Sequence, residues 1–354
     1  LARRRRFFVN IFLLFLTFAI ENQESQPVMD VSTNKENHAA PVGRFAPSPT
    51  GRMHLGNIFT AVLSWLSIRS RGGKWILRIE DLDPQRSKYE YARQLEDDLQ
   101  WLGLTWDEGG IDDIGPHGPY RQSLRGDIYN QYLTRLKSTG LTYPCFCTRA
   151  DIMATQAPHQ SDGRVIYKGT CRPEEFPSCE PLQEPARRHA TRLFVPNEEI
   201  EFNDGVFGKQ HSNLATDCGD FILQRADSAW AYQLAVVVDD GLMGVTEVVR
   251  GSDLLLSTAQ QLYLYNLLEF KVPAYVHLPL ICNTEMRRLS KRDQSLSMEA
   301  LRLCYSPDEI IGHIAALANL IPSYSPCSLK ELIKLFSWDK IPQTMSIVHD
   351  DISQ

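Results

Sequence analysis

The sequence predicts an open, mostly parallel α/β sheet that is interrupted by an insertion and followed by a short helical lobe. From Gly43 onward, short strands alternate with amphipathic helices, which is the pattern of parallel α/β domains. Between about residues 141 and 219, stretches rich in Pro, Cys and charge replace this alternation. With 354 residues, 43% of them hydrophobic, the chain can bury one large core or two smaller ones.

The first half of the sheet pattern is expected in residues 42–140. The predicted elements are a strand at 43–46, a helix at 58–68, a strand at 75–79, a helix around 95–102 and a helix around 124–136. The last of these helices should end at Gly140, because glycine is a common residue just after a helix C-terminus.

The second half of the sheet pattern is expected in residues 220–296, and a helical tail in residues 297–354. The predicted elements are strands at 231–238, 245–249 and 276–280, a helix opened by Ser257 and Gln260, and tail helices starting at Ser306 and Ser328. Within the insertion, residues 141–219, the segment 202–206 carries a hairpin turn signal.

Residues 1–41 are expected to form a leader outside the catalytic body. A basic flank precedes the apolar run at 7–20, which has the outline of a signal peptide but is too short for a comfortable membrane span. We favour upstream sequence that precedes a start at Met29; the alternative is a membrane anchor. Residues 21–41 are polar and aperiodic, which predicts disorder.

Charge and cysteine content limit the possible functions. A formal net charge of −6 argues against a protein that coats nucleic acids, although a local basic stripe for RNA remains compatible with it. Eight cysteines are too few for a secreted disulfide scaffold of this length, and the pair Cys145 and Cys147 favours metal chemistry in a reducing compartment. We therefore expect a cytoplasmic protein. We also expect a monomer without a membrane partner.

The strongest local signal is the segment from Arg44 to Asn57, in which a strand passes through a Pro-rich turn into a helix. A helix N-terminus offers N–H groups and a positive dipole end to phosphate, and Gly56 allows a nucleotide to approach the backbone. His54 and Asn57 add short polar side chains. A bare His-x-Gly-Asn would be an ordinary loop, but the long flanking run favours nucleotide binding.

This segment resembles the HIGH signature of glutamyl-tRNA synthetases, which are class I aminoacyl-tRNA synthetases, with Asn57 in place of the final histidine. Residues 287–291 resemble the KMSKS loop of that family. The resemblance implies a Rossmann-type catalytic domain that uses ATP with magnesium, with His54, Asn57 and Lys291 acting by positioning and charge stabilisation. The ATP contacts that it implies are His54, Gly56, Asn57, Arg288, Leu289, Ser290 and Lys291.

Recognition of glutamate can be argued from charge, because its two carboxylates and one ammonium each need a partner once water is removed. Glu80, after the second strand, would take the ammonium, and Arg44 and Arg250 suit the carboxylates. The ordinary alternative is a solvated charge, but strand ends are where open α/β sheets bind ligands. The resemblance adds Phe45, Ala46, Pro47, Ser48 and Tyr232 to this pocket.

The insertion carries Cys145, Cys147 and Cys171, whose thiolates suit one structural zinc ion that still needs a fourth ligand. The residues alone leave Tyr167, His159 and Cys179 open, as well as the alternative of unrelated buried cysteines. The resemblance favours Tyr167, because short glutamyl-synthetase-like proteins typically complete the site with a tyrosine.

The resemblance covers roughly residues 43–303 and is greatest to the short synthetases that attach glutamate to the queuosine base of tRNA(Asp). After Lys291, 63 residues remain (354 − 291), which we expect to be too few for anticodon-binding domains. The implied function is activation of L-glutamate with ATP without tRNA, and transfer to queuosine-containing tRNA(Asp). The alternatives are charging of a tRNA 3′ end, a small-molecule nucleotidyltransferase, and a catalytically silent tRNA-binding paralogue.

Overall fold

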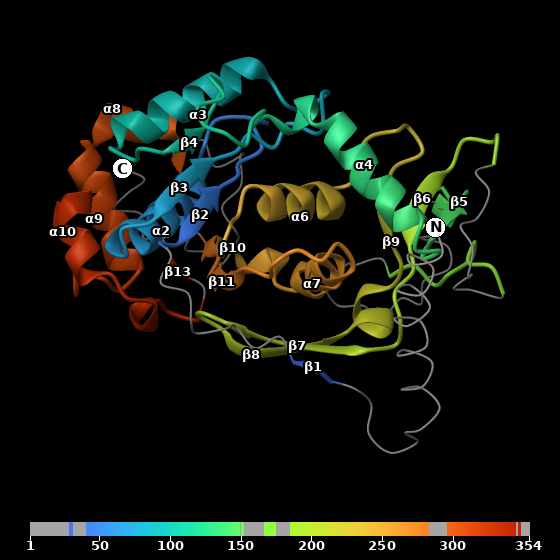
Figure 1. The fold of residues 1–354 in the computed structure, drawn as a ribbon. Helices are drawn as coiled ribbons and strands as arrows, with labels where there is room; N and C mark the ends of the chain where they lie inside the picture. Colours follow the sequence, from blue (N-terminus) through green and yellow to red (C-terminus); the bar gives the residue numbers. More distant parts are fainter. Residues whose placement is uncertain are drawn as a thin grey trace.

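A computed structural model describes residues 28–30, 40–148, 150–151, 166–174, 185–282, 296–344 and 346–347. An eight-stranded sheet forms its centre, in the order β1-β7-β11-β10-β2-β3-β4, with β8 paired to β7 (Figure 1). Every pairing in this sheet is parallel except β7 with β8. The strands are β1 (Val28–Asp30), β2 (Val42–Phe45), β3 (Lys74–Leu77), β4 (Glu108–Gly109), β7 (Glu199–Asp204), β8 (Gly208–Asn213), β10 (Glu247–Gly251) and β11 (Ala274–Leu278).

The strand order reverses between β2 and β10. From β2 the chain proceeds through α2 (Leu55–Ser70) to β3, and through α3 (Tyr89–Trp101) to β4. On the other side, β10 is followed by α7 (Ser257–Leu267) and β11. In open α/β sheets, ligands bind at the carboxyl ends of the strands beside such a switch point.

Two hydrophobic clusters cover the two faces of the sheet. Neighbouring residues of one strand belong to different clusters, as Ile76 and Leu77 of β3 do, because successive side chains of a strand point to opposite faces. One cluster packs the sheet against α2, α3 and the C-terminal helices α8 (Met298–Cys304), α9 (Pro307–Leu317) and α10 (Leu329–Leu335). The other packs it against α4 (Gly126–Lys137), α6 (Tyr232–Leu242) and α7.

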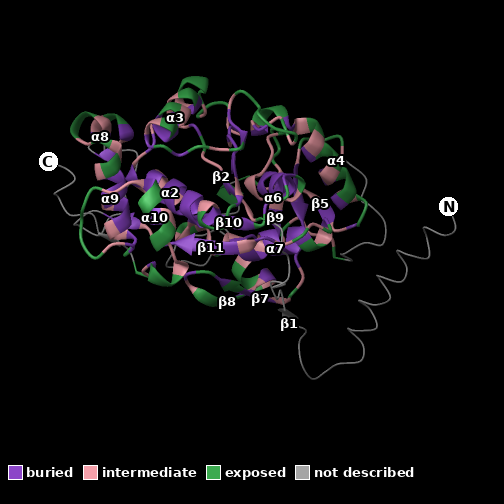
Figure 2. Cartoon of the chain, turned by 60° about the vertical axis from the view of Figure 1, so that its left-hand side comes forward, coloured by how far each residue is buried: buried purple, intermediate pink, exposed green. Residues whose placement is uncertain are grey.

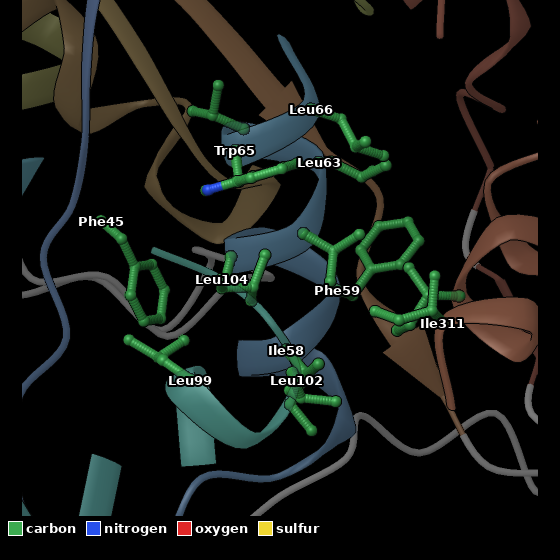
Figure 3. Close-up of a cluster of buried hydrophobic side chains, with 14 of the residues drawn as sticks. Phe45, Ile58, Phe59, Leu63, Trp65, Leu66, Leu99, Leu102, Leu104 and Ile311 are labelled. Carbon is green, nitrogen blue, oxygen red and sulfur yellow. The ribbon is translucent and has the colours of Figure 1, made fainter. Parts of the chain in front are cut away.

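Helix α2 is buried on nearly all sides, and this fixes the position of the turn before it. Figure 3 shows Ile58, Phe59, Leu63 and Leu66 of this helix among side chains that include Ile311 of α9. A helix that is apolar all round must be covered on several faces. In Figure 2, α2 is largely buried, whereas the outer helices α3 and α4 carry exposed residues.

A second, antiparallel sheet is formed by β5 (Thr142–Cys145), β6 (Ala190–Leu193) and β9 (Phe221–Gln224). The predicted insertion therefore supplies strands to both sheets, since β7 and β8 pair within the central one. A short parallel pair, β12 (Ile281–Cys282) with β13 (Ser346–Ile347), follows β11. The division at residues 42, 141, 220 and 297 stays a prediction.

Most predicted elements are confirmed, and the two tail helices begin as expected. Ser306 and Ser328 each cap their helix in a capping box, with Glu309 and Glu331 respectively. Residues 202–206 lie at the β7–β8 hairpin, where Asp204 pairs with Gly208.

Four predictions at this level are wrong. Residues 28–30 of the predicted disordered leader form β1 and pair with β7 in the central sheet. The predicted strand at 231–238 is the first part of α6; a short, uniformly buried apolar run does not distinguish a strand from a buried helix. Ser257 does not cap α7, because the cap position is Leu256, which makes no side-chain cap. Leu124 lies before α4 in a short 3₁₀ turn and is 57% exposed, so it is not part of the apolar stripe.

Candidate active site

A cavity of about 450 Å³ opens at the carboxyl ends of β2, β3 and β10, beside the switch point. Each described residue that we predicted for glutamate or ATP lines it: Arg44, Phe45, Ala46, Pro47, Ser48, His54, Gly56, Asn57, Glu80, Tyr232 and Arg250. Lining residues that the sequence did not indicate are Thr50, Phe59, Thr60, Val249, Gly251, Asp253, Leu254, Pro279, Leu280 and Ile281. The predicted set thus lines a single cavity.

His54 and Asn57 form the cap of α2. The His54 Nδ1 accepts a hydrogen bond from the Gly56 N–H at 3.1 Å, and the Asn57 Oδ1 accepts one from the His54 N–H at 3.1 Å. With Nδ1 as acceptor, the ring proton lies on Nε2. The capping box explains why an amide works at position 57, since Oδ1 holds the helix start and the amide nitrogen remains to donate.

Glu80 is anchored to a buried ionic network. Its Oε1 accepts from Arg78 Nη2 at 3.1 Å, and Arg78 Nη1 donates to Asp240 Oδ1 at 2.6 Å. The Glu80 backbone N–H donates to the Pro47 carbonyl at 3.0 Å, which ties the two strand-end loops together. Burial raises the pKa of Glu80, and the charges of Arg78 and Arg44 oppose this shift. An ammonium group of a ligand would favour the ionised carboxylate in the same way.

Arg44 also contacts Asp240, the acid that pairs with Arg78. Its Nε is 3.5 Å from Asp240 Oδ1, and its Nη1 donates to the Val249 carbonyl at 3.0 Å, joining β2 to β10. The side chain is only 5% exposed. Arg78 shares Asp240 with Arg44 and also contacts Glu80 and Asp239. Among the described residues, Arg44 has only the longer ionic contact with Asp240, so its guanidinium suits a ligand carboxylate.

Arg250 is held by uncharged groups. Its Nε donates to His277 Nε2 at 2.9 Å, and its Nη1 donates to Gln261 Oε1 at 2.7 Å. Its Nη2 donates to Thr258 Oγ1 at 2.8 Å. Tyr232, the first residue of α6, borders the same cavity, and burial raises the pKa of its phenol, which therefore stays neutral.

The network behind the cavity was missed by sequence analysis. Arg78 contacts Asp239 at 3.7 Å as well as Asp240, and Asp239 accepts from Arg125 Nε at 2.6 Å. The available signal was the pair Asp239 and Asp240 within an otherwise apolar run, because adjacent acids that become buried require cationic partners.

Three cysteines gather at the end of β5, in the second sheet. The Sγ atoms of Cys145, Cys147 and Cys171 lie within 4.8 Å of one another, with Cys147 and Cys171 3.5 Å apart. Tyr167 Oη lies 3.5 Å from Cys145 Sγ and 3.8 Å from Cys147 Sγ. Zinc–sulfur bonds of about 2.3 Å place tetrahedral ligand sulfurs about 3.8 Å apart, so three thiols and one phenol fit a closed zinc site.

Surrounding groups support this cluster. The Phe146 N–H donates to Cys171 Sγ at 3.4 Å, and the Cys171 N–H donates to Tyr167 Oη at 2.6 Å. The Arg192 guanidinium lies 3.7 Å over the Tyr167 ring. Burial acts to raise the pKa of Cys171, but the Phe146 N–H and neighbouring side chains outweigh it and lower this pKa, whereas burial raises the pKa of Cys147 and of Tyr167. A bound metal would therefore have to displace protons from these last two groups. The alternative ligands His159 and Cys179 lie outside the described residues.

The loop that resembles KMSKS also lies outside the described residues. It spans residues 287–291, and the predicted contacts of Arg288, Leu289, Ser290 and Lys291 with ATP stay a prediction. The segment begins directly after β12 and ends before α8. Pro279, Leu280 and Ile281, which precede it in the sequence, line the cavity.

Comparison with known proteins identifies the fold and the family. Residues 42–341 match the family model of class I tRNA synthetases (E and Q), catalytic domain. A glutamyl-Q tRNA(Asp) synthetase of Nitratidesulfovibrio vulgaris is 46% identical over 88% of this chain and 96% of its own. One of Symbiobacterium thermophilum is 47% identical over 85% of this chain and 94% of its own. The chain belongs to the glutamyl-Q tRNA(Asp) synthetase family.

A solved structure agrees with this assignment. The glutamate tRNA ligase of Elizabethkingia meningosepticum, in complex with its amino acid, has a TM-score of 0.75 and 28% identity over 89% of this chain and 68% of that one. Like other members of the glutamyl-Q tRNA(Asp) synthetase family, the chain is thus an ATP-dependent ligase with a Rossmann-type class I catalytic domain. Among the residues that the structure describes, no helix has the length and apolar character needed to cross a bilayer.

Proposed function

We propose that this protein activates L-glutamate with ATP in the absence of tRNA, and then transfers the glutamyl group to the queuosine base of tRNA(Asp). The observation that carries the first step is the placement of Arg44, Glu80 and Arg250 around one cavity of about 450 Å³. Two cationic groups and one carboxylate match the two carboxylates and one ammonium of glutamate. The names of the relatives support the acceptor.

In the first step, an oxygen of the glutamate α-carboxylate attacks the α-phosphorus of ATP. The bond from that phosphorus to the bridging oxygen breaks, and pyrophosphate leaves with its electron pair. Magnesium that accompanies ATP supplies charge neutralisation at the phosphates. The chain itself contributes N–H groups at the start of α2, together with His54 and Asn57. Lys291, in the segment 287–291, contributes a further positive charge.

In the second step, a hydroxyl of the queuosine diol attacks the activated carboxyl carbon, and AMP leaves. A base in a tRNA loop can be splayed into a pocket, whereas a 3′ end must be delivered from a distance. The proposal includes a cytoplasmic, monomeric enzyme that holds one structural zinc ion through Cys145, Cys147, Tyr167 and Cys171.

Glutamate-dependent exchange of pyrophosphate into ATP, run with and without tRNA, tests the first step. We expect exchange without tRNA, and a loss of about 10²-fold in Lys291→Ala, as when a single transition-state donor is removed. Exchange that requires added tRNA would contradict the proposal.

Labelled glutamate tests the acceptor. We expect it on queuosine-containing tRNA(Asp), and neither on the unmodified tRNA(Asp) nor on tRNA(Glu). Transfer to the 3′ end of tRNA(Glu) at a comparable rate would establish an ordinary glutamyl-tRNA synthetase instead. Absence of both exchange and transfer would leave the catalytically silent paralogue.

A further inference from the structure

Arg250 is a buried cation that has no direct ionic partner among the residues that the structure describes. It is 4% exposed, and its guanidinium donates to His277, Gln261, Thr258 and the Leu254 carbonyl at 2.7–3.3 Å. These four hydrogen bonds use Nε–H, one Nη1–H and both Nη2–H groups, which leaves one Nη1–H for the cavity. Arg44, which also lines the cavity, differs because its Nε lies 3.5 Å from Asp240 Oδ1.

His277 connects Arg250 to an acid. Because His277 Nε2 accepts from Arg250, the ring proton lies on Nδ1, which donates to Asp204 Oδ2 at 2.6 Å. Both His277 and Asp204 are 0% exposed at their side chains. The three residues come from β7, β10 and β11, so the chain of hydrogen bonds crosses the sheet behind the cavity.

The groups around His277 keep it neutral. Burial lowers its pKa, and the charges of Arg250 and Arg44 lower it further, while Asp204 opposes them. The other groups in contact with the ring are uncharged: Thr258 Oγ1 is 3.3 Å from Nε2, and the Tyr275 ring stacks at 6.1 Å. A neutral imidazole with its proton on Nδ1 can accept from the guanidinium, whereas an imidazolium cannot.

Asp204 is itself fixed at the turn of the β7–β8 hairpin. Its Oδ1 accepts from the Val206 N–H at 3.0 Å and the Phe207 N–H at 2.9 Å, and its Oδ2 accepts from the His277 backbone N–H at 3.0 Å. Burial acts to raise the pKa of Asp204, but the hydrogen bonds from His277 and from this turn outweigh it and hold the pKa below its usual value. Asp204 is therefore an ionised acceptor, held in place by hydrogen bonds, at the end of the series Arg250, His277 and Asp204.

We propose that Asp204 and His277 are positioning residues for glutamate, which aim the remaining Nη1–H of Arg250 into the cavity and keep its charge available to a substrate carboxylate. This inference rests on the proposed function. A carboxylate in direct contact with Arg250 would compete with the substrate, and a cation buried without any nearby acid would be costly. An imidazole between Asp204 and Arg250 avoids the competition and lowers the cost. The negative charge of Asp204 is near Arg250, but it does not use the guanidinium N–H groups.

Two substitutions of His277 distinguish the roles of its two ring nitrogens. In His277→Asn, the short amide can still donate towards Asp204 but does not reach Arg250. In His277→Gln, the longer side chain carries a carbonyl oxygen to the position of Nε2 and restores the acceptor. We expect His277→Asn to raise KM for glutamate about 10-fold or more, the cost of losing a hydrogen bond to a charged group, and His277→Gln to raise it less.

Pyrophosphate exchange should be measured for both variants with glutamate and ATP varied separately. KM for ATP should change by less than about twofold, because Arg250 is assigned to glutamate and not to ATP. A loss of folded protein would lower the maximal rate and leave both KM values unchanged, so it can be told apart from a positioning defect. His313→Asn is the matched control, because His313 lies in α9 and stacks on Tyr324 at 3.9 Å. If His277→Asn does not fold, Thr258→Val removes one Nη2 acceptor at similar volume and should raise KM for glutamate severalfold.

Wild-type KM for glutamate in His277→Asn or in Thr258→Val, or an equal rise of both KM values, would overturn the positioning role while glutamate activation stands. Absence of exchange in the wild-type protein would instead overturn the proposed function, and this inference with it.

Discussion

The wall of the cavity and the cysteine cluster are both built from polar side chains, but they are completed differently. In the wall, groups of the chain itself hold each charged side chain by hydrogen bonds: Arg78 contacts Asp240 at 2.6 Å and Glu80 at 3.1 Å, and uncharged groups hold Arg250. In the cluster, Cys147 and Cys171 face each other at 3.5 Å, as two groups that must each lose a proton to bind a metal.

The two regions differ in whether the folded chain alone stabilises their polar groups or a metal is also needed. Burial raises the pKa of Cys147 to about 11, so this thiol stays protonated near neutral pH without a cation. Zinc would displace that proton and add its binding free energy to the stability of the second sheet. The wall requires no such addition, so the recognition of glutamate should be independent of metal occupancy. Four experiments test this contrast.

The largest effect is expected from Glu80→Gln. The amide keeps a contact with Arg78 but removes the negative charge that would pair with the substrate ammonium, and breaking a buried ion pair costs about 3 kcal/mol or more. We expect kcat/KM for glutamate in exchange to fall about 10²-fold or more. Glu269→Gln is the control, because Glu269 pairs with Arg135 on the surface and is 76% exposed, where such pairs contribute little. A loss below about threefold in Glu80→Gln would remove Glu80 from the site.

Cys171→Ser should separate the two regions. We expect zinc affinity to fall by about tenfold or more and the midpoint of thermal unfolding to drop, while exchange without tRNA persists in the folded protein. Tyr167→Phe should also weaken zinc binding, because it removes Oη and keeps the ring. Cys304→Ser, at an exposed cysteine outside the cluster, is the control.

Metal analysis and exchange assays decide this prediction together. Full zinc content in Cys171→Ser would transfer the role to Cys179 or His159, and loss of exchange in step with zinc would show that the wall depends on the cluster after all.

Lowering the pH should weaken glutamate binding through Glu80. Its pKa is raised, mainly by burial, so the ionised form that pairs with an ammonium is complete above this pKa and is lost as the pH falls through it. We expect KM for glutamate to rise by up to about tenfold for each pH unit below that point. Exchange measured between about pH 5 and pH 8 checks this, and the Glu80→Gln variant should lack this rise.

The smallest effect is expected from Gly56→Ala. An added Cβ would lie 3.1 Å from His54 Cε1 and Nδ1, so the imidazole must shift by a few tenths of an ångström. We expect kcat for exchange to fall a few-fold while the protein stays folded, because reacting groups tolerate little misplacement. Gly126→Ala is the control, since its Cβ would make only ordinary contact with Trp230 at 3.5 Å. An unchanged rate would show that the ring position is not critical.

Much of the site was predictable because its residues lie next to strand ends in the sequence itself. Arg44, Glu80 and Arg250 each stand at or just after the carboxyl end of a strand, and parallel strands bring these ends to one edge. The turn from Arg44 to Asn57 is local in the same sense, since His54 and Asn57, which together cap α2, are only three positions apart in the sequence. Short-range rules of capping and strand alternation are sufficient for such features.

The partners that hold these residues were decided only by the tertiary structure. Arg44 reaches the Val249 carbonyl 205 positions away, His277 reaches Asp204 across 73 positions, and Asp240 lies on a helix that the sequence had suggested as a strand. Which acid meets which base depends on the faces that are buried and on the order of the strands, because the cost of burying a charge is relieved only where its partner is brought into contact. The residue types beside the strand ends therefore identify the groups that line the cavity, and the packing of the sheet and its helices determines how each of them is held.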